Sequence, residues 1–280
     1  MGEVFRLACV QVNACNDIVS NVEVTSALVR EAVSKGAVFV SLPECVALME
    51  PDTIALYEKS YREERHPALL AFSDLASHFK IWLHVGSLAV FSDDNQIVNR
   101  TFLIDPFGIV VARYDKIHMF DVDLGDGQEY RESATYKPGG SAVIADLPWG
   151  GAGLTICYDV RFPALYTHLA NGGADFIGIP SAFTRTTGCA HWHVLMRARA
   201  IETGCWVFAA AQCGDHVGGR QTYGHSLVVN PWGEIVSEAG EEPGVIFADI
   251  DPTQVMTARK SIPSLANIRR YASPEIVSNG

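Results

Sequence analysis

The feature that most constrains the fold is a repeated alternation of short, β-branched apolar runs with amphipathic stretches. Near the start, Val4 to Val12 has the composition of a strand, Asn21 to Ser34 has apolar residues at helical spacing, and Ala37 to Leu42 has the composition of a second strand. A strand, a helix and a strand in this order predict a βαβ unit. Parallel strands therefore belong to the expected sheet.

The alternation continues through two similar halves. The first half adds a helix at 68–79 and strands at 81–90, 97–104 and 109–114. The second half contains strands at 153–157, 175–179, 206–211, 225–229 and 245–250, and helices at 162–171 and 191–202. Strands that are apolar almost throughout are typical of sheets covered on both faces. Two such halves predict an α/β fold in which two sheets are stacked between helix layers, a four-layer α-β-β-α sandwich.

Length and composition favour one large domain. The 280 residues are 48% hydrophobic and 19% charged, which is sufficient for one large core, and no segment has the composition of a linker. We therefore expect a single domain over residues 1–280. The longest stretch without a regular pattern runs from Asp121 to Gly140, and a loop of this length is usually functional or disordered.

Cysteine usage and charge exclude several classes of protein. The seven cysteines lie at 9, 15, 45, 157, 189, 205 and 213, an odd number without a Cys-x-x-Cys pair, which indicates the reducing cytoplasm. The amino terminus lacks a signal-peptide pattern, and no apolar run approaches the roughly 20 residues of a membrane helix. A net charge of −11 without a Lys/Arg cluster argues against nucleic acid and membrane surfaces as partners. We expect a soluble cytoplasmic protein.

Cys157 ends the apolar, strand-like run Gly-Leu-Thr-Ile-Cys157 and is followed by Tyr-Asp-Val-Arg, which begins a predicted helix. A cysteine in this place has two interpretations. Free cysteines are among the most buried residue types, so a structural role is the more common one. At a strand-to-helix turn, however, the N–H groups of the helix start favour a thiolate and could stabilise an oxyanion, which suits a nucleophile.

Two more residues with catalytic chemistry occupy equivalent places. Glu44 follows the strand-like run Val-Phe-Val-Ser-Leu-Pro, and Lys116 follows Ile-Val-Val-Ala-Arg-Tyr-Asp. Ligands bind at the carboxyl edge of α/β sheets, so we expect these two side chains to meet Cys157 there. A carboxylate that takes the thiol proton, a sulfur that attacks a carbonyl and an ammonium that stabilises the oxyanion make an amide hydrolase. Taken singly, Glu44 and Lys116 would be ordinary surface charges.

These residues lie in motifs that resemble the nitrilase superfamily of carbon–nitrogen hydrolases. The motifs are Leu-Pro-Glu44, Tyr-Asp-Lys116-Ile-His, Ile-Cys157-Tyr-Asp-Val-Arg-Phe-Pro and Ala-His-Trp-His-Val-Leu-Met-Arg-Ala-Arg-Ala-Ile-Glu, and the resemblance extends over residues 10–233. It implies the four-layer sandwich, a Glu-Lys-Cys triad at Glu44, Lys116 and Cys157, and a reaction without a metal or other cofactor. It also implies packing into a homodimer or larger homo-oligomer.

The resemblance further implies a second active-site glutamate between the lysine and the cysteine. The segment Tyr-Arg-Glu132-Ser-Ala-Thr-Tyr-Lys-Pro-Gly is similar to its setting in the family, which places it at Glu132, with Glu129 as the competing assignment. Its expected role is to hold Lys116 and orient the substrate amide, and the alternative is a solvent-facing carboxylate. We expect the backbone N–H of Tyr158 to be the second oxyanion donor, because it directly follows the nucleophile at the turn.

The expected substrate is a small carboxylated amide. The carboxyl-terminal half is most similar to the Nit-type amidases, and the run Ala-Ala-Ala-Gln-Cys-Gly resembles the branch that acts on deaminated glutathione. The scheme then runs through a cysteine thioester with release of ammonia. Arg161, Phe183 and Arg185 are the expected substrate contacts, Arg220 is a further arginine near the pocket loops, and an ion pair with Asp159 is the alternative for Arg161. ω-Amidase, nitrilase and N-carbamoyl amino acid amidohydrolase activities use the same triad and stay open.

A zinc site is the first alternative from another class of protein. Cys189-Ala-His191-Trp-His193 carries zinc-type ligands, but on a helix the two histidines point about 200° apart. Trp192, with Leu195, Met196 and Ala200, instead marks a buried helix face, with Arg197 and Arg199 off that face. Core packing is therefore the better interpretation of this segment, and no metal site is expected.

A nucleotide-binding loop is the second alternative. Gly150-Gly-Ala-Gly153 has the glycines of such a loop, but it precedes a predicted strand. A phosphate-binding loop has to follow a strand and open a helix, so that backbone N–H groups at the helix start can contact the phosphates. The glycine run therefore does not support nucleotide binding.

Overall fold

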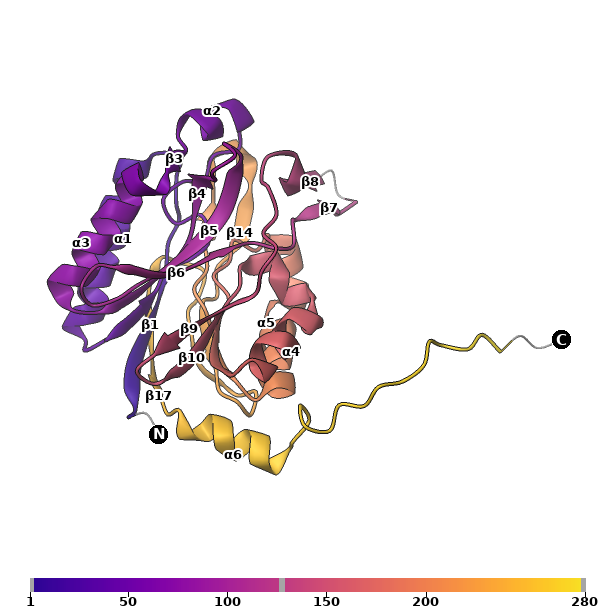
Figure 1. Ribbon diagram of the computed structural model, residues 1–280. Helices are drawn as coiled ribbons and strands as arrows, with labels where there is room; N and C mark the ends of the chain where they lie inside the picture. Colours follow the sequence, from indigo (N-terminus) through magenta and orange to yellow (C-terminus); the bar gives the residue numbers. More distant parts are fainter. Residues whose placement is uncertain (1–2, 126–128, 278–280) are drawn as a thin grey trace.

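The computed structural model describes residues 3–125 and 129–277 and has four layers (Figure 1). Two mixed sheets, each with parallel strands at its centre, lie face to face, α1 and α3 flank one of them, and α4 and α5 flank the other. The predicted four-layer α-β-β-α sandwich is thus confirmed. In the described part of the chain, no helix combines the length and apolarity that crossing a membrane requires.

The first sheet has the strand order β17-β1-β2-β4-β5-β6, with the short β3 beside β4. Its parallel strands are β1, β2 and β4, while β5, β6 and β17 join by antiparallel pairing. The strands are β1 (Phe5–Gln11), β2 (Phe39–Ser41), β3 (Tyr61–Arg62), β4 (Trp82–Phe91), β5 (Ile97–Ile104), β6 (Val110–Asp115) and β17 (Gly244–Ile250). The last strand of the chain therefore completes the sheet that the first strand begins.

The second sheet has the order β16-β15-β12-β11-β10-β9, with β10, β11 and β12 parallel. Its strands are β9 (Val143–Leu147), β10 (Gly150–Leu154), β11 (Ala174–Gly178), β12 (Trp206–Ala209), β15 (Leu227–Val229) and β16 (Ile235–Glu238). The glycine run from Gly150 lies within β10 and pairs on both sides, so it forms no phosphate loop. The predicted strand at 153–157 is displaced toward the amino terminus, because the chain turns after Leu154.

The helices are α1 (Ile18–Ser34), α2 (Thr53–Glu58), α3 (Pro67–Phe79), α4 (Pro163–Asn171), α5 (Arg185–Thr203) and α6 (Thr253–Ser261). Helix α1 begins at Asp17, whose carboxylate accepts a hydrogen bond from the Ser20 N–H, and α3 begins at Pro67, which needs no N–H partner. The 3₁₀ turns of the described residues are η1 (Glu63–Arg65), η2 (Glu132–Ala134), η3 (Cys157–Arg161) and η4 (Val217–Gly219). The long irregular stretch contains the hairpin strands β7 (Asp121–Asp123) and β8 (Glu129–Arg131), and a second hairpin joins β13 (Cys213–Asp215) to β14 (Gln221–Tyr223).

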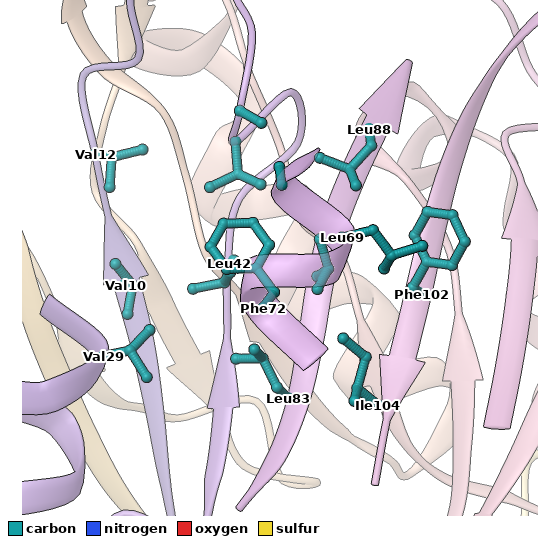
Figure 2. Close-up of a cluster of buried hydrophobic side chains, with 14 of the residues drawn as sticks. Val10, Val12, Val29, Leu42, Leu69, Phe72, Leu83, Leu88, Phe102 and Ile104 are labelled. Carbon is teal, nitrogen blue, oxygen red and sulfur yellow. The ribbon is translucent and has the colours of Figure 1, made fainter. Parts of the chain in front are cut away.

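The outer face of the first sheet is closed by apolar side chains from α1 and α3. Val29 of α1 and Phe72 of α3 are fully buried against strand residues such as Val10, Leu83 and Phe102 (Figure 2). Burying a side chain of this kind contributes about 1.5–3 kcal/mol relative to leaving it exposed. This packing holds the strands rigid and so fixes where their carboxyl ends lie.

Aromatic side chains fill the space between the two sheets. The rings of Phe5 in β1 and Phe176 in β11 meet edge to face at 5.6 Å, and those of Phe39 in β2 and Phe208 in β12 meet at 5.4 Å. Beside them His84 is fully buried, with Ser41 and Thr101 hydroxyls 2.9 and 3.0 Å from its two ring nitrogens. Burial lowers the pKa of His84 to about 3, so this imidazole is neutral.

Helix α5 differs from its prediction in two respects. It begins at Arg185 instead of His191, because the Thr184 hydroxyl caps it by accepting from the Thr187 N–H. Arg199, expected off the buried face, is 5% exposed, and its Nε donates to the Val160 carbonyl at 2.7 Å. The guanidinium thus binds the 3₁₀ turn that follows β10.

Candidate active site

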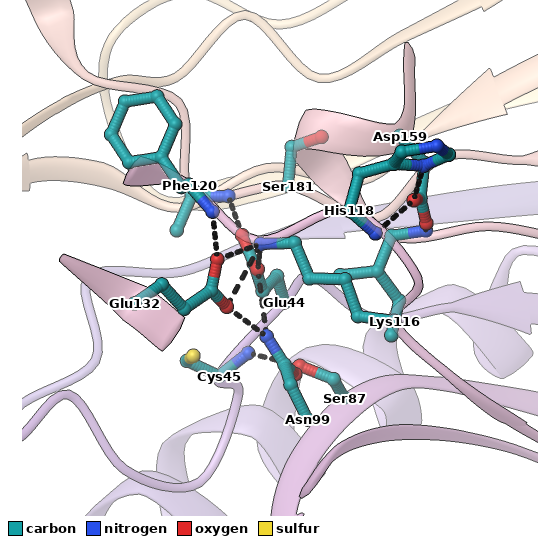
Figure 3. A network of polar contacts seen from close by, with 12 residues as sticks. Glu44, Cys45, Ser87, Asn99, Lys116, His118, Phe120, Glu132, Asp159 and Ser181 are labelled. Atoms are coloured by element: carbon teal, nitrogen blue, oxygen red, sulfur yellow. Dashed lines mark hydrogen bonds and ion pairs between the residues drawn. The ribbon is translucent and has the colours of Figure 1, made fainter. Parts of the chain in front are cut away.

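Four segments bring the predicted catalytic side chains to one end of the sandwich. Glu44 follows β2, Lys116 follows β6, Cys157 opens η3 after β10, and Glu132 opens η2. Figure 3 shows Glu44, Glu132 and Lys116 pointing toward one another. Strand ends therefore supply three of the groups, as the sequence predicted, and the long loop supplies the fourth.

The loop that carries Glu44 is held close to the neighbouring strand. A Cβ atom at Gly86 of β4 would lie only 2.1 Å from the Leu42 carbonyl oxygen, so glycine alone lets the backbones approach in this way. Glu44 is 4% exposed, its Oε2 accepts from the Ala182 N–H at 2.8 Å, and its carbonyl accepts from Gln212 Nε2 at 3.0 Å. These contacts tie the Glu44 carboxylate to both halves of the molecule.

Lys116 lies between two carboxylates. Its Nζ is 2.9 Å from Glu44 Oε1 and 2.8 Å from Glu132 Oε2, and its side chain is 2% exposed. Asn99 Nδ2 donates to both glutamates as well, at 3.0 Å to Glu44 and 3.2 Å to Glu132. The Phe120 N–H donates to Glu132 Oε2 at 2.7 Å. The geometry thus places Glu132 in the position expected of the second glutamate.

Glu129, the competing assignment, has different surroundings. It is exposed and pairs with Arg131 at 2.6 Å, although it also borders the pocket described below. It therefore lies near the mouth of the site and not beside Lys116.

Burial and charge set the protonation states of the buried pair. Burial acts to raise the pKa of Glu44, but the Lys116 ammonium outweighs it and holds that pKa below its usual value. Burial likewise acts to lower the pKa of Lys116, but the Glu132 and Glu44 carboxylates outweigh it and raise that pKa well above its usual value. At neutral pH Glu44 is therefore a carboxylate and Lys116 an ammonium.

Cys157 is a buried thiol and not a thiolate. Burial, followed by the Glu44 carboxylate, raises the pKa of Cys157 well above its usual value, and the Lys116 ammonium offsets only part of this. A short 3₁₀ turn follows Cys157, and the Glu44 carboxylate opposes any stabilisation of a thiolate by the N–H groups of that turn. Glu44 acts directly on the pKa of the thiol, so a proton acceptor lies near the sulfur.

The backbone at Cys157 has a left-handed conformation, with φ of +47°. Such a conformation is costly outside glycine and persists where the surroundings impose it. The Cys157 N–H donates to the Pro180 carbonyl at 2.9 Å and is thereby occupied. Tyr158 follows in the first turn of η3, where N–H groups have no acceptor within the helix.

Asp159 holds this turn from inside. It is fully buried, and its carboxylate accepts from the Ile156 N–H at 2.9 Å, the Tyr114 hydroxyl at 2.7 Å and the His118 N–H at 3.1 Å. The proposed ion pair between Asp159 and Arg161 is not formed. The carboxylate instead contacts the His118 ring, whose Nδ1 lies 2.7 Å from Asp159 Oδ1.

A pocket of about 480 Å³ gives access to the catalytic groups, which is large enough for a ligand of peptide size. Its described lining includes all four predicted catalytic residues, Phe183 and the arginines Arg131 and Arg220. Arg161 and Arg185 lie outside this lining. Arg161 stacks over the Phe183 ring at 5.3 Å, and Arg185 is 3.4 Å from Glu241.

Helix α5 separates the residues of the alternative zinc cluster. His191 contacts Arg161, at 3.2 Å between Nδ1 and Nη1, whereas His193 contacts Glu238 on β16. Within residues 3–125 and 129–277, Cys189, His191 and His193 therefore form no shared metal site.

Sequence reasoning missed several groups that complete the site. Asn99 and the backbone N–H groups of Phe120 and Ala182 were not identified. Asn99 had a detectable signal, because asparagine is unfavourable inside a strand such as β5. The two backbone donors left no signal, since any residue type carries an N–H.

The sandwich and this arrangement of charges beside a thiol define a hydrolase of carbon–nitrogen bonds. Comparison with known families agrees, since residues 6–260 match the carbon–nitrogen hydrolase family. The chain belongs to this family. The match lies within the single domain that we predict for residues 1–280.

Individual relatives are similar over most of the chain. The deaminated glutathione amidase of Yersinia enterocolitica is 41% identical over 236 residues, 81% of this chain and 82% of that protein. The structure of Saccharomyces cerevisiae Nit3, a member of branch 10 of the nitrilase superfamily, matches with a TM-score of 0.84 at 29% identity, covering 93% of this chain and 95% of that chain. The amidase of Nesterenkonia sp. AN1 matches with a TM-score of 0.77 at 26% identity, covering 92% and 98%.

Proposed function

We propose that the chain is a cysteine-dependent amidase that acts on a small carboxylated amide of the deaminated-glutathione type. The observation that carries the proposal is the buried network of Glu44, Lys116 and Glu132 beside the Cys157 thiol in one pocket. This network combines a base, a cation and a nucleophile, which are the groups that acyl transfer needs.

The first step joins sulfur to the substrate carbonyl. Glu44 takes the thiol proton while the sulfur of Cys157 attacks the carbon, and the carbonyl electron pair moves onto oxygen. Lys116 and the Tyr158 N–H stabilise the resulting oxyanion. Removing one such hydrogen-bond donor to the oxyanion typically lowers kcat by a factor on the order of 10²–10³. Because the resting thiol is neutral, proton transfer and attack are coupled.

The oxyanion then collapses and the carbon–nitrogen bond breaks. Glu44, now a carboxylic acid, gives its proton to the departing nitrogen, which leaves a thioester on Cys157. Water attacks the thioester while Glu44 takes a proton from it. As the carbon–sulfur bond breaks, Glu44 returns this proton to the sulfur, so the acid is released and the thiol and the carboxylate are restored. The leaving amine is ammonia only for a primary amide. For a deaminated-glutathione-like substrate it is the amino group of the remaining peptide, so the expectation of ammonia covers only part of the substrate range.

Two relatives support this chemistry. In a glutamate-to-glutamine mutant of the Nesterenkonia amidase, acrylamide adds to the active-site cysteine by Michael addition. The relative from Yersinia enterocolitica is a deaminated glutathione amidase. In this chain, Cys157 and Glu44 both lie in sequence motifs that resemble those of the family.

Arg220 is the group that we propose for the substrate carboxylate. Its Nη2 donates to the Ala182 carbonyl at 2.6 Å, its guanidinium stacks on the Tyr130 ring at 5.4 Å, and it acts electrostatically on Glu44. Its buried Nε has no hydrogen-bond partner among the described residues. A buried donor without a partner is costly, and a bound carboxylate would satisfy it.

Turnover on four substrates tests the reaction. We expect the highest kcat/KM on deaminated glutathione, ahead of a primary ω-amide, a nitrile and an N-carbamoyl amino acid, with free amine and acid measured by mass spectrometry. Cys157→Ala should lower kcat more than about a thousandfold, while Cys189→Ala, which removes an exposed thiol outside the pocket, should not change it. Near-normal turnover by Cys157→Ala would exclude the mechanism.

The role of Arg220 has a separate test. Arg220→Gln should raise KM for the carboxylated amide at least tenfold while changing KM little for an uncharged amide of equal length. Arg131→Gln is the comparison, because that guanidinium is already paired with Glu129. An equal effect of Arg220→Gln on both amides would show that Arg220 does not read the carboxylate.

A further inference from the structure

Three side chains with metal-ligand chemistry meet outside the pocket. His193 lies on α5, His225 lies two residues before β15, and Glu238 ends β16. One ligand atom from each, the two imidazole nitrogens and a carboxylate oxygen, lies within 4.8 Å of the others. None of the three belongs to the described lining of the catalytic pocket. The cluster is therefore distinct from the catalytic machinery.

The two imidazoles converge on one point. His193 Nε2 and His225 Nδ1 each lie 2.8 Å from the same oxygen, Glu238 Oε1. The side chains are 32%, 21% and 33% exposed, respectively, so water can reach them. Two nitrogens and one carboxylate in this arrangement resemble the three-ligand sites of Zn²⁺, where the remaining positions are filled by water.

The surroundings hold the His225 ring in place. The ring stacks on Tyr223 at 4.3 Å, with 24° between the planes. The backbone of His225 is fixed on both sides, since its carbonyl accepts from Trp192 Nε1 at 2.8 Å and its N–H donates to the Gly240 carbonyl at 3.0 Å. A fixed imidazole loses little freedom when it binds a metal, so the site is partly pre-organised.

We propose that His193, His225 and Glu238 bind one divalent transition-metal ion of the Zn²⁺ class. Soft-to-borderline ions prefer imidazole nitrogen, which favours Zn²⁺, Ni²⁺ and Cu²⁺ over Mg²⁺ and Ca²⁺. The net charge of −11 on the whole chain also favours a cation. Of the residues Cys189, His191 and His193, only His193 is a ligand of the proposed metal site.

Calorimetric titration with Zn²⁺ at pH 7.5 tests the site in the full chain. Cys157→Ala serves as the parent protein, because its catalytic position cannot take the metal through sulfur. The parent should bind one Zn²⁺ with a dissociation constant in the micromolar range. His193→Ala and Glu238→Gln, each added to the parent, should weaken binding at least tenfold. His78→Ala, which removes an exposed histidine on α3, should leave the affinity unchanged.

Two further measurements separate a metal site from a hydrogen-bonded cluster. His225→Asn keeps a residue that tolerates the observed φ of +55°, so it removes the ligand without straining the fold, and it should weaken Zn²⁺ binding to the same extent. Co²⁺ bound to the parent should show visible absorption without a sulfur charge-transfer band. The proposal is overturned if the parent binds no Zn²⁺ at 1 mM, if His193→Ala leaves affinity unchanged, or if Cys189→Ser abolishes binding.

Discussion

Lys116 holds two buried carboxylates together. In a protein without the Lys116 ammonium, replacing one of these carboxylates by a neutral group should therefore increase the free energy of unfolding. Nζ lies 2.9 Å from Glu44 and 2.8 Å from Glu132. At an effective dielectric constant near 20, each contact is worth about 6 kcal/mol of attraction before the cost of desolvation. Lys116→Met leaves both carboxylates buried without their cation. Breaking a buried pair in this way typically costs about 3–5 kcal/mol of folding free energy.

A second substitution reverses part of that loss. In wild type, Glu132→Gln should be destabilising, because Lys116 then loses one of its two anionic partners. In the Lys116→Met protein the same change removes the repulsion between two carboxylates that both accept a hydrogen bond from Asn99 Nδ2, an energy on the order of 4 kcal/mol at the same dielectric constant. We therefore expect the double variant to be at least about 2 kcal/mol more stable than Lys116→Met alone.

Urea unfolding followed by tryptophan fluorescence measures all four proteins in the cycle. The Lys116→Met protein should also gain stability from pH 7 to pH 5, because like-charge repulsion raises a carboxyl pKa in the folded state and protonation relieves it. The reasoning is refuted if Glu132→Gln destabilises the Lys116→Met protein as much as it destabilises wild type.

Three other predictions concern positions around this network. Gly86→Ala should lower turnover more than tenfold by displacing the segment before Glu44, whereas Gly140→Ala, where a Cβ would meet nothing within 4 Å, should not. His84 has a pKa lowered to about 3, so the stability from its neutral form is complete above pH 6.5 and is lost as pH falls toward 3. From pH 6.5 to pH 5 the loss is about 2 kcal/mol in urea unfolding, and His84→Gln should abolish it. Asp159→Asn should lower both Tm and kcat, because the amide offers N–H groups to the donors that now bind the carboxylate; unchanged kcat would show that the nucleophile turn does not depend on Asp159.

The strands and helices that form the layers could be predicted from the sequence, because the spacing of apolar residues within each element is a local pattern. The strand at 97–104 was placed as the structure has it, and α1 and α3 differ from prediction by three residues or fewer at their starts. The partner of β1 was not predictable, because β17 is over 230 residues away and strand pairing across that distance leaves no local pattern. The late start assigned to α5 had another cause. Its first turn contains Thr186, Thr187 and Gly188, which are weak helix formers.

The candidate site divides in the same way. Motif position predicted where Glu44, Lys116 and Cys157 would meet, because carboxyl ends of strands share an edge. The groups that set the pKa of Cys157 were not predictable in detail, because that pKa depends on which charges face the sulfur in space and not on the neighbouring sequence. Three arginines were named from their closeness along the chain to the predicted pocket loops. Of these, Arg220 lines the pocket together with Arg131, whereas Arg161 and Arg185 lie outside its lining.

The pairing of β1 with β17 has a consequence for synthesis. Phe5 lies opposite Ile250, and Gln11 lies opposite Gly244, so one edge of β1 has no intramolecular partner until the ribosome has passed residue 250. At typical translation rates that interval lasts on the order of 10–50 s. An unpaired apolar strand edge can pair with other nascent chains during this time. The amino-terminal sheet of this enzyme therefore emerges early but closes last, and a chain cut before residue 244 would keep that edge open permanently.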